Sequence, residues 1–189
     1  MINEALQFIV QALNQALKNN FLSDEDLVVM NNVIQADGTI PFINQNKVVL
    51  SLINIEKETN KPFNTYKRPL EDNNYAAGSP SEYYNLDILF SSNFDDYSES
   101  LKMLSAVIAY FQSHTSLTPA DSSAIPAGIK KLDVDVERLA FHQMHSLWTA
   151  MGAKYQPSIL YKVRLLNIQS GQVKGTVAAV TKTEKMVTQ

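Results

Sequence analysis

The stretch that decides the fold is Leu147–Arg164, which reads LWTAMGAKYQPSILYKVR. Its first residues complete a helical repeat that ends at Gly152, since glycine readily adopts the left-handed conformation that closes many helices. Pro157 then turns the chain, and Ile159–Ile168 continues as an apolar run typical of a strand. The stretch therefore predicts a helix, a turn and a strand in succession, and nothing in it resembles an active site.

Apolar side chains recur at helical spacing in three segments of the chain. The first covers residues 2–19. The second follows Asp96, a good N-cap, and has Glu99 at the position of the acid in a capping box. The third ends at Gly152, with Asp135 or a neighbour as its expected N-cap. The stripes expected to be buried are, in the first, Ile2, Leu6, Ile9, Val10, Leu13, Ala16 and Leu17; in the second, Leu101, Leu104, Val107, Ile108 and Phe111; in the third, Ala140, Met144, Leu147, Trp148 and Met151.

Strands are predicted wherever apolar residues alternate or run together between turn residues. The Asp37-Gly38 pair marks the turn after the first of them. The last is weaker and rests on Val173, Val177 and Val180. Residues 60–82 and 115–132 lack periodicity and are expected to be irregular surface connections suited to contacts. The predicted strands are Leu27–Ile34, Lys47–Glu56, Tyr83–Phe90, Leu132–Val136, Ile159–Ile168 and Gln172–Thr181.

These elements favour an α+β fold. The helices are too few to cover both faces of a parallel sheet, so we expect a mixed, mainly antiparallel sheet packed with about three helices. A chain of 189 residues has the size of one domain. We expect a single α+β domain over residues 1–168, followed by a C-terminal arm or flexible tail over residues 169–189.

The composition excludes several classes of protein. Hydrophobic residues make up 45% and charged residues 19% of the chain, a balance typical of a globular domain. No apolar run approaches the roughly 18–20 residues that cross a bilayer, and the N-terminus lacks the basic region and cleavage site of a signal peptide, so no direct membrane insertion is expected. The absence of cysteine excludes disulfides, thiolate metal sites and a cysteine nucleophile.

The charge is unevenly distributed along the chain. The net charge is −3, yet residues 159–189 carry five basic side chains and a single acid, Glu184. The remainder is therefore acidic, which argues against a nucleic-acid partner because such a protein needs a coherent basic face. The basic C-terminal segment is suited to an acidic protein surface, or is simply a solubilising terminus.

Three alternating acids, Asp133, Asp135 and Glu137, are the best candidates for a metal site. An extended backbone would place all three carboxylates on one side, as in metal-dependent hydrolases. The alternative is that they are structural, because acids in this position also suit a helix N-terminus. A metal-dependent hydrolase built on these three residues is thus one alternative function, although no basic groove or histidine accompanies them.

The histidines give weaker signals. His142 and His145 lie three residues apart on a predicted helix and could share a metal ion, but no HExxH pattern accompanies them. We expect His142 to be solvated and His145 to pack against an aromatic ring. His114 closes the second helix, where a cation or donor suits the helix dipole. No nucleophile elbow or phosphate-binding loop is present, so neither an enzymatic activity nor a cofactor is predicted.

The arrangement of these segments resembles the tail-terminator (cap) protein family of extracellular contractile injection systems. These are phage-tail-like particles of the antifeeding prophage and Photorhabdus virulence cassette type. Four elements carry the resemblance: the amphipathic opening Ile2–Leu17, the strand VVLSLINIEKETN that ends at Asn60, the unit LDILFSSNFDDYSESLKMLSAVIAYFQSH, and LW--MG-KYQPSILYKVR. They fall within residues 1–168, and the tail after Ile168 matches least.

The resemblance implies a structural protein with a phage tail-terminator-like fold. Its partners would be other copies of itself, in a six-fold ring, and the sheath and inner-tube proteins, whose polymerisation the ring ends at the baseplate-distal end. Such a protein would be cytoplasmic during assembly and then part of an intracellular or released particle. A non-structural adaptor or chaperone of the same particle is the other alternative.

The C-terminal segment is the candidate for partner contact. Its valine spacing and basic charge suggest a donated strand that adds to a sheet of the sheath, which is a recurrent mode of recognition. The alternative is a disordered terminus. The residues expected to make the contact are Val173, Lys174, Val177, Val180, Lys182 and Lys185.

Overall fold

A computed structural model describes residues 1–59, 67–69, 74–78, 82–118, 129, 131–168 and 173–178. Over these residues the helices are α1 (Ile2–Phe21), α2 (Tyr97–Ser113) and α3 (Phe141–Met151), together with the 3₁₀ turn η1 (Phe42–Asn44). The strands are β1 (Val28–Met30), β2 (Lys47–Lys57), β3 (Lys67–Pro69), β4 (Asn74–Gly78), β5 (Glu82–Asn93), β6 (Ser116–Leu117), β7 (Leu132–Val136), β8 (Ser158–Ile168) and β9 (Val173–Ala178).

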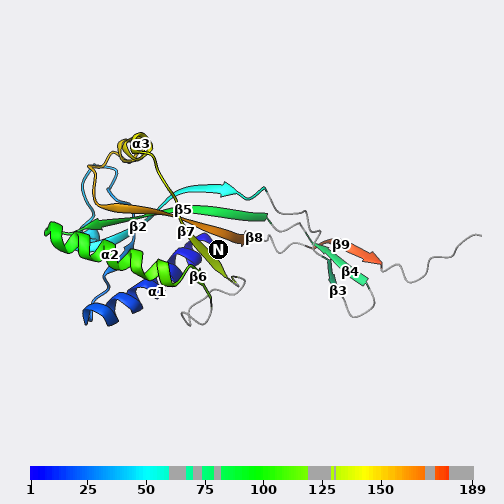
Figure 1. Cartoon of the computed structure of the whole chain (residues 1–189). Helices are drawn as coiled ribbons and strands as arrows, with labels where there is room; N and C mark the ends of the chain where they lie inside the picture. The colour runs from blue at the N-terminus through cyan, green and yellow to red at the C-terminus, as the bar shows by residue number, and fades with distance from the viewer. Residues whose placement is uncertain are drawn as a thin grey trace, which may run out of the picture.

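Six of these strands form the main sheet, in the order β1-β2-β5-β8-β7-β6. Strand β1 runs parallel to β2, and every other pair is antiparallel. A second sheet of three strands, β3-β4-β9, lies beyond the ends of β5 and β8 (Figure 1). The predicted α+β class with a mixed, mainly antiparallel sheet and three helices is confirmed.

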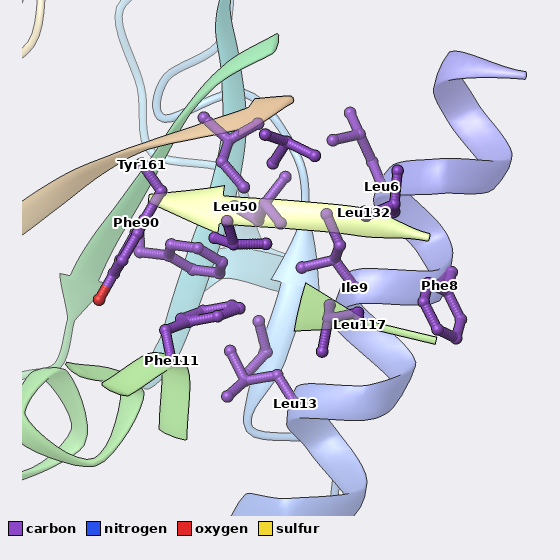
Figure 2. Close-up of a cluster of buried hydrophobic side chains, with 14 of the residues drawn as sticks. Leu6, Phe8, Ile9, Leu13, Leu50, Phe90, Phe111, Leu117, Leu132 and Tyr161 are labelled. Atoms are coloured by element: carbon purple, nitrogen blue, oxygen red, sulfur yellow. The ribbon is translucent and has the colours of Figure 1, made fainter. Parts of the chain in front are cut away.

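Helices α1 and α2 cover one face of the main sheet (Figure 1). Alternate residues of β5 point into this layer, as strand geometry requires, and Phe90 is fully buried there. Its ring centroid lies 5.4 Å from that of Phe111 on α2 and 5.9 Å from that of Tyr161 on β8. Figure 2 shows how α1 contributes Leu6, Phe8, Ile9 and Leu13 to the same cluster. This layer is the main hydrophobic core of the described residues.

Helix α3 packs on the opposite face of the sheet. The buried residues of its smaller cluster are Val33, Leu89, Trp148 and Leu160. Of the stripe predicted for this helix only Trp148 is buried, whereas Ala140 is exposed and Met144, Leu147 and Met151 are half-buried. The prediction of a fully buried stripe was wrong because part of the opposing sheet face is polar and offers α3 a narrow apolar strip.

The helix termini agree with the sequence prediction in part. Asp96 is the N-cap of α2 and its Oδ1 accepts a hydrogen bond of 2.7 Å from the Ser98 amide. Gly152 caps α3 with φ of 68°, as predicted. Glu99, however, pairs with Lys102 at 2.6 Å. Asp135 was wrongly predicted to cap α3: the helix begins at Phe141, because the chain stays extended and its acids pair across the sheet.

Helix α1 is tied to the sheet edge by one buried amide. The Asn14 Nδ2 donates a 2.8 Å hydrogen bond to the Val28 carbonyl, and its Oδ1 accepts 2.8 Å bonds from the amides of Leu27 and Val28. These contacts satisfy backbone groups on the outer side of β1, the edge strand. The regular strand is confined to Val28–Met30, shorter than the predicted Leu27–Ile34.

The two segments predicted to be irregular contain short strands. Residues 60–82 include β3 and β4, and residues 115–132 begin with β6. The pairing of β4 with β9, about a hundred residues later in the chain, could not be read from local periodicity. The division into a domain over residues 1–168 and an arm over residues 169–189 stays a prediction. Strand β9 lies in the predicted arm and pairs with β4, which lies in the predicted domain.

Candidate interaction surfaces

The predicted partner-contact segment lies partly in β9. Val173, Lys174 and Val177 belong to this strand, and Val180, Lys182 and Lys185 lie outside the described residues. Strand β9 pairs antiparallel with β4 and stands at the edge of the described three-stranded sheet, with Tyr75 opposite Val177. An edge strand presents unpaired backbone groups on its outer side. Among the described residues no further strand pairs with the outer side of β9, and the predicted partner contact stays a prediction.

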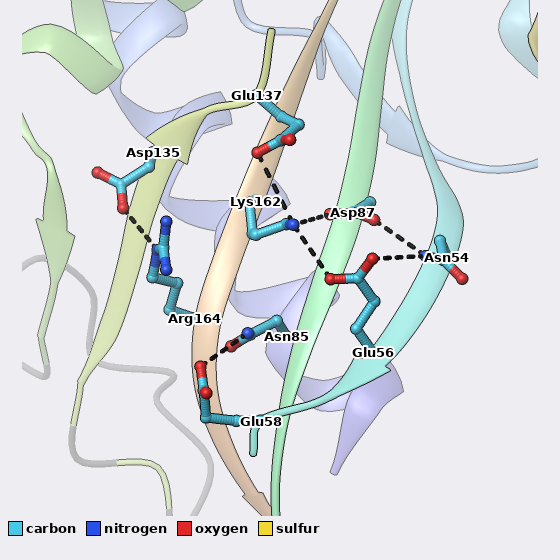
Figure 3. A network of polar contacts seen from close by, with 9 residues as sticks. All are labelled: Asn54, Glu56, Glu58, Asn85, Asp87, Asp135, Glu137, Lys162 and Arg164. Atoms are coloured by element: carbon cyan, nitrogen blue, oxygen red, sulfur yellow. Dashed lines mark hydrogen bonds and ion pairs between the residues drawn. The ribbon is translucent and has the colours of Figure 1, made fainter. Parts of the chain in front are cut away.

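A charged network crosses the main sheet beside α3 (Figure 3). At its centre Lys162, whose side chain is 15% exposed, donates to Glu56 at 3.1 Å and lies 3.6 Å from Asp87 and 3.8 Å from Glu137. Asn54 donates a 3.2 Å hydrogen bond to the other oxygen of Asp87. The hydrogen bond to Glu56 is the main reason that the pKa of Lys162 is raised. The Lys162 ammonium is half-buried, has three carboxylates around it and joins β2, β5 and β8.

The three acids proposed as a metal site are held apart on different partners. Asp135 accepts a 2.8 Å hydrogen bond from Arg164, Glu137 faces Lys162, and Asp133 pairs with Lys131 at 2.8 Å. Burial alone would raise the pKa of Asp133, but hydrogen bonds from Lys131 and Ser116 outweigh it and lower the pKa. Among the described residues no group of three His, Cys, Asp or Glu side chains is arranged to hold a metal ion. The geometry lends no support to the hydrolase alternative.

The histidines are placed without catalytic partners in the described part of the chain. His142 and His145 are both exposed, so the expected packing of His145 against an aromatic ring is not observed. His114 stacks on Tyr110 with ring centroids 4.5 Å apart, and its Nδ1 lies 3.0 Å from the Tyr110 carbonyl oxygen. This histidine completes the C-terminus of α2, as predicted.

Exposed apolar side chains gather at one end of the central strands, a feature that sequence reasoning missed. We define the η1 surface as Phe42, Ile43, Tyr97 and Tyr155, whose side chains are 89%, 59%, 67% and 63% exposed. Hydrogen bonds connect the segments that carry them: Asn93 donates to the Asn44 carbonyl at 2.8 Å, and Gln156 donates to Asn93 at 3.0 Å. The available signal was an uncharged segment, Thr39–Asn46, directly after a turn.

A cavity of about 310 Å³ opens between α3 and the edge of the main sheet. Strand β2 contributes Ser51, Leu52 and Ile53 to its lining, and Leu147, Ala150 and Met151 come from α3. The remaining lining comes from residues 32–34, after β1. The lining is mixed: no charged side chain contributes to it, and Asn32 and Ser51 supply polar groups beside the apolar side chains.

The chain belongs to the Pvc16 N-terminal domain family, whose model matches residues 4–182. Two solved structures share its fold. One is the PVC sheath/tube terminator of an extracellular contractile injection system in the extended state, with a TM-score of 0.66, 13% identity and 100% of this chain covered. The other is the tube-terminating cap of the anti-feeding prophage, with a TM-score of 0.58, 14% identity and 95% covered.

The chain spans 64% and 60% of the lengths of those two proteins. No curated protein matches it. Among the described helices, none combines the length and the apolar character needed to span a bilayer. The resemblance drawn from the sequence is thus confirmed at the level of family and fold.

Proposed function

We propose that this chain is a structural cap, or tail terminator, of a contractile injection particle. In this proposal copies of the chain form a ring, six-fold in number, that ends the polymerisation of inner tube and sheath at the baseplate-distal end. Assembly takes place in the cytoplasm and the ring becomes part of the finished particle. The protein acts by contact alone and alters no covalent bond.

The observation that carries this proposal is the agreement of fold over nearly the whole chain with two proteins that are themselves terminators. The family match over residues 4–182 supports it independently of the superposition. The surfaces support it as well. Asp133, Asp135 and Glu137 pair with cations instead of forming a metal site, and the exposed apolar side chains of the η1 surface offer area for contact with a partner protein.

Termination follows from the physics of growing polymers. A tube or sheath end presents strand edges and open patches that template the next subunit. A cap satisfies those groups with one of its faces and offers no equivalent face outward. We propose that β9 and the residues after it, with Val173, Lys174, Val177, Val180, Lys182 and Lys185, add to a sheath sheet as a donated strand.

The function is tested by deleting the gene in cells that produce the particle. Tubes and sheaths of irregular length are expected in electron micrographs, with normal length restored by the wild-type gene. Uniform particles of normal length after deletion would end the proposal. Mass spectrometry of purified particles separates a structural cap, which is present in them, from an adaptor that is absent.

The donated strand is tested by truncation after Ser170. Strand β8, the last strand of the main sheet along the chain, ends at Ile168, so the truncated chain should still unfold cooperatively on heating. Its binding to sheath, measured by co-sedimentation, should be lost. A truncated chain that caps particles normally would contradict the strand donation and leave the cap function standing.

A further inference from the structure

Strand β2 is longer than the strand that covers its outer side. The pairing of β1 with β2 ends at Leu50, whose carbonyl accepts a 3.1 Å hydrogen bond from the Asn31 amide. Strand β2 continues to Lys57 and stays paired with β5 on its inner side. Among the described residues no strand pairs with the outer side of β2 beyond this point. We call residues 52–56 the β2 edge.

The hydrogen bonds of the neighbouring backbone show which groups of the β2 edge point outward. The Leu50 carbonyl faces β1, so the backbone groups of Leu52, two residues further along, face the same outer side. A β-bulge then shifts the pairing with β5 by one residue. Beyond the bulge the Glu58 amide donates a 2.8 Å hydrogen bond to the Tyr83 carbonyl of β5, so Ile55, three residues earlier, faces outward. Leu52 and Ile55 thus present N–H and C=O groups with which an extended chain can pair.

The side chains beside the β2 edge differ between the two faces of the sheet. Leu52 packs against the main core, and Ile55, which lies opposite a residue of that core, is 43% exposed, so this face offers apolar area. On the α3 face Glu56 is 48% exposed and belongs to the network in which three carboxylates surround the Lys162 ammonium (Figure 3). Lys57 points to the opposite face, because side chains alternate along a strand. The α3 face of the edge therefore carries an excess of negative charge.

The cavity beside α3 opens along the same edge. Ser51–Ile53 form one of its walls, and Leu147 and Met151 form part of another. Its lining is mixed, since Asn32 and Ser51 add polar groups to the apolar side chains. A side chain with an aliphatic stem and a polar end, such as that of lysine or arginine, matches a lining of this kind.

We propose that the β2 edge accepts, as an added strand, an extended segment of a particle protein other than this chain. The segment alternates apolar residues, which cover Leu52 and Ile55, with lysine or arginine, which lie beside Glu56 and in the cavity beside α3. Main-chain hydrogen bonds supply the affinity of such contacts, and the alternate side chains supply the specificity. The inference rests on the proposed function, because the particle provides the partner. It differs from the strand donation by β9, since here the chain receives the strand.

A synthetic peptide, acetyl-TVKVKVT-amide, tests the edge of the full chain. Directly opposite residues of an antiparallel pair share a face, so valines that lie over Ile55 turn their N–H groups towards the edge. Amide exchange followed by NMR should show protection of Leu52 and Ile55 at saturating peptide. N-methylation of the central valine should weaken binding at least about tenfold, because a hydrogen bond to the edge is lost. N-methylation of a lysine, whose N–H points away from the edge, should leave binding unchanged.

The charge of the segment is tested with a second peptide, acetyl-TVEVEVT-amide. It should bind at least about tenfold more weakly than the lysine peptide at low salt, since like charges oppose each other on the α3 face. Glu56→Gln should narrow this difference. Asp24→Asn, which removes an exposed acid remote from β2 in the chain, provides the control and should leave the difference unchanged.

Proline substitution tests the edge in the particle. Ile55→Pro removes an N–H group that faces outward, and proline is tolerated on edge strands at such positions, so the variant should fold as Ile55→Ala does. Ile55→Ala also loses the side chain but keeps the N–H group. In particles purified from cells that produce either variant, the content of the Ile55→Pro chain should fall below that of Ile55→Ala. Failure of Ile55→Pro to fold would show that its amide is used inside the sheet and would overturn the proposal.

The proposal is also overturned if the lysine peptide leaves Leu52 and Ile55 unprotected, if the two peptides bind equally, or if Ile55→Pro enters particles normally. Self-association of the isolated chain that Ile55→Pro abolishes would place a second copy on the edge, and would overturn it too. Each of these results leaves the cap function standing as long as deletion of the gene produces irregular lengths, so the two failures are distinguishable.

Discussion

The two faces of the main sheet are built by the same strands, yet they differ in chemistry. The face under α1 and α2 is a continuous hydrophobic layer, and the opposite face is divided between the small apolar cluster of α3 and the network around Lys162. On β5 the difference lies in alternate residues, with Ile88 and Phe90 on one side and Asp87 on the other. The first face supplies most of the stability, and the second leaves surfaces available for contact.

The largest effect should come from the continuous face. Phe90→Ala removes a fully buried ring that contacts Phe111 and Tyr161, and should lower the free energy of unfolding by about 3–5 kcal/mol. Urea unfolding of the isolated chain measures this loss. The matched control is Phe42→Ala, the same substitution at an 89% exposed side chain, which should change stability by less than about 0.5 kcal/mol. Equal losses for both variants would contradict the assignment of the core.

The next effect concerns the edge of that face. Asn14→Ala leaves the Val28 carbonyl and the amides of Leu27 and Val28 without their partner, and should cost about 2–4 kcal/mol. Asn19→Ala, at an exposed position of the same helix, provides the control and should be neutral or slightly stabilising through helix propensity. Amide exchange near β1 should also accelerate in Asn14→Ala alone. Unchanged amide exchange in Asn14→Ala would show that the hydrogen bonds of Asn14 do not hold the edge strand β1 in place.

The polar face should respond less. Lys162→Met leaves the buried Asp87 carboxylate without its cation and should cost about 1–3 kcal/mol near neutral pH, less than a fully buried pair because Glu56 and Glu137 are partly exposed. Asp87→Asn in the same chain should restore part of the loss. A double variant no more stable than Lys162→Met would argue that the network does not act as a unit.

The same network has a defined pH dependence. The folded state raises the pKa of Lys162 above its ordinary value of 10.5, so its contribution is present below that pH and is lost as the pH rises through the folded pKa. Thermal unfolding of the wild type and of Lys162→Met at rising pH measures this trend, because the deficit of the variant should shrink as Lys162 of the wild type loses its proton. A deficit independent of pH would contradict an electrostatic origin.

The smallest effect is expected at the margin of the polar face. The Arg164 and Asp135 side chains are 46% and 54% exposed, so Arg164→Ala should cost less than about 1 kcal/mol despite the 2.8 Å contact. Added salt should reduce even this difference, since screening acts on exposed pairs. A larger, salt-independent loss would place Arg164 in the core of the network.

The face under α1 and α2 was easier to predict from the sequence than the face under α3. The stripe of α1 and the alternation of β5 are local patterns, and the structure buries Leu6, Ile9, Leu13 and Phe90 as they indicate. The stripe of α3 is equally regular in sequence, yet only Trp148 is buried. What α3 packs against is decided by strands β2, β5 and β8 together, and no single segment carries that information.

The candidate surfaces were harder to predict than the fold. Asp133 and Asp135 alternate along β7 as expected, but Glu137 lies beyond the end of this strand, and the cations that pair with the three acids, Lys131, Arg164 and Lys162, come mostly from β8. The η1 surface depends on Asn44, whose burial and hydrogen bonds hold Phe42 and Ile43 outward. A sequence shows apolar residues in this segment, but it does not show that they point away from the core.

By itself the sequence determined the amphipathic helices, the long strands, the glycine C-cap of α3 and the resemblance to a family of caps. These depend on periodicity and on local backbone preferences, which neighbouring residues express wherever the segment lies. Only the tertiary structure decided that β9 pairs with β4, that Lys162 lies within ion-pair distance of three carboxylates, and that a cavity opens beside α3. Each of these joins residues distant in the chain, and their free energy arises only when the strands are side by side.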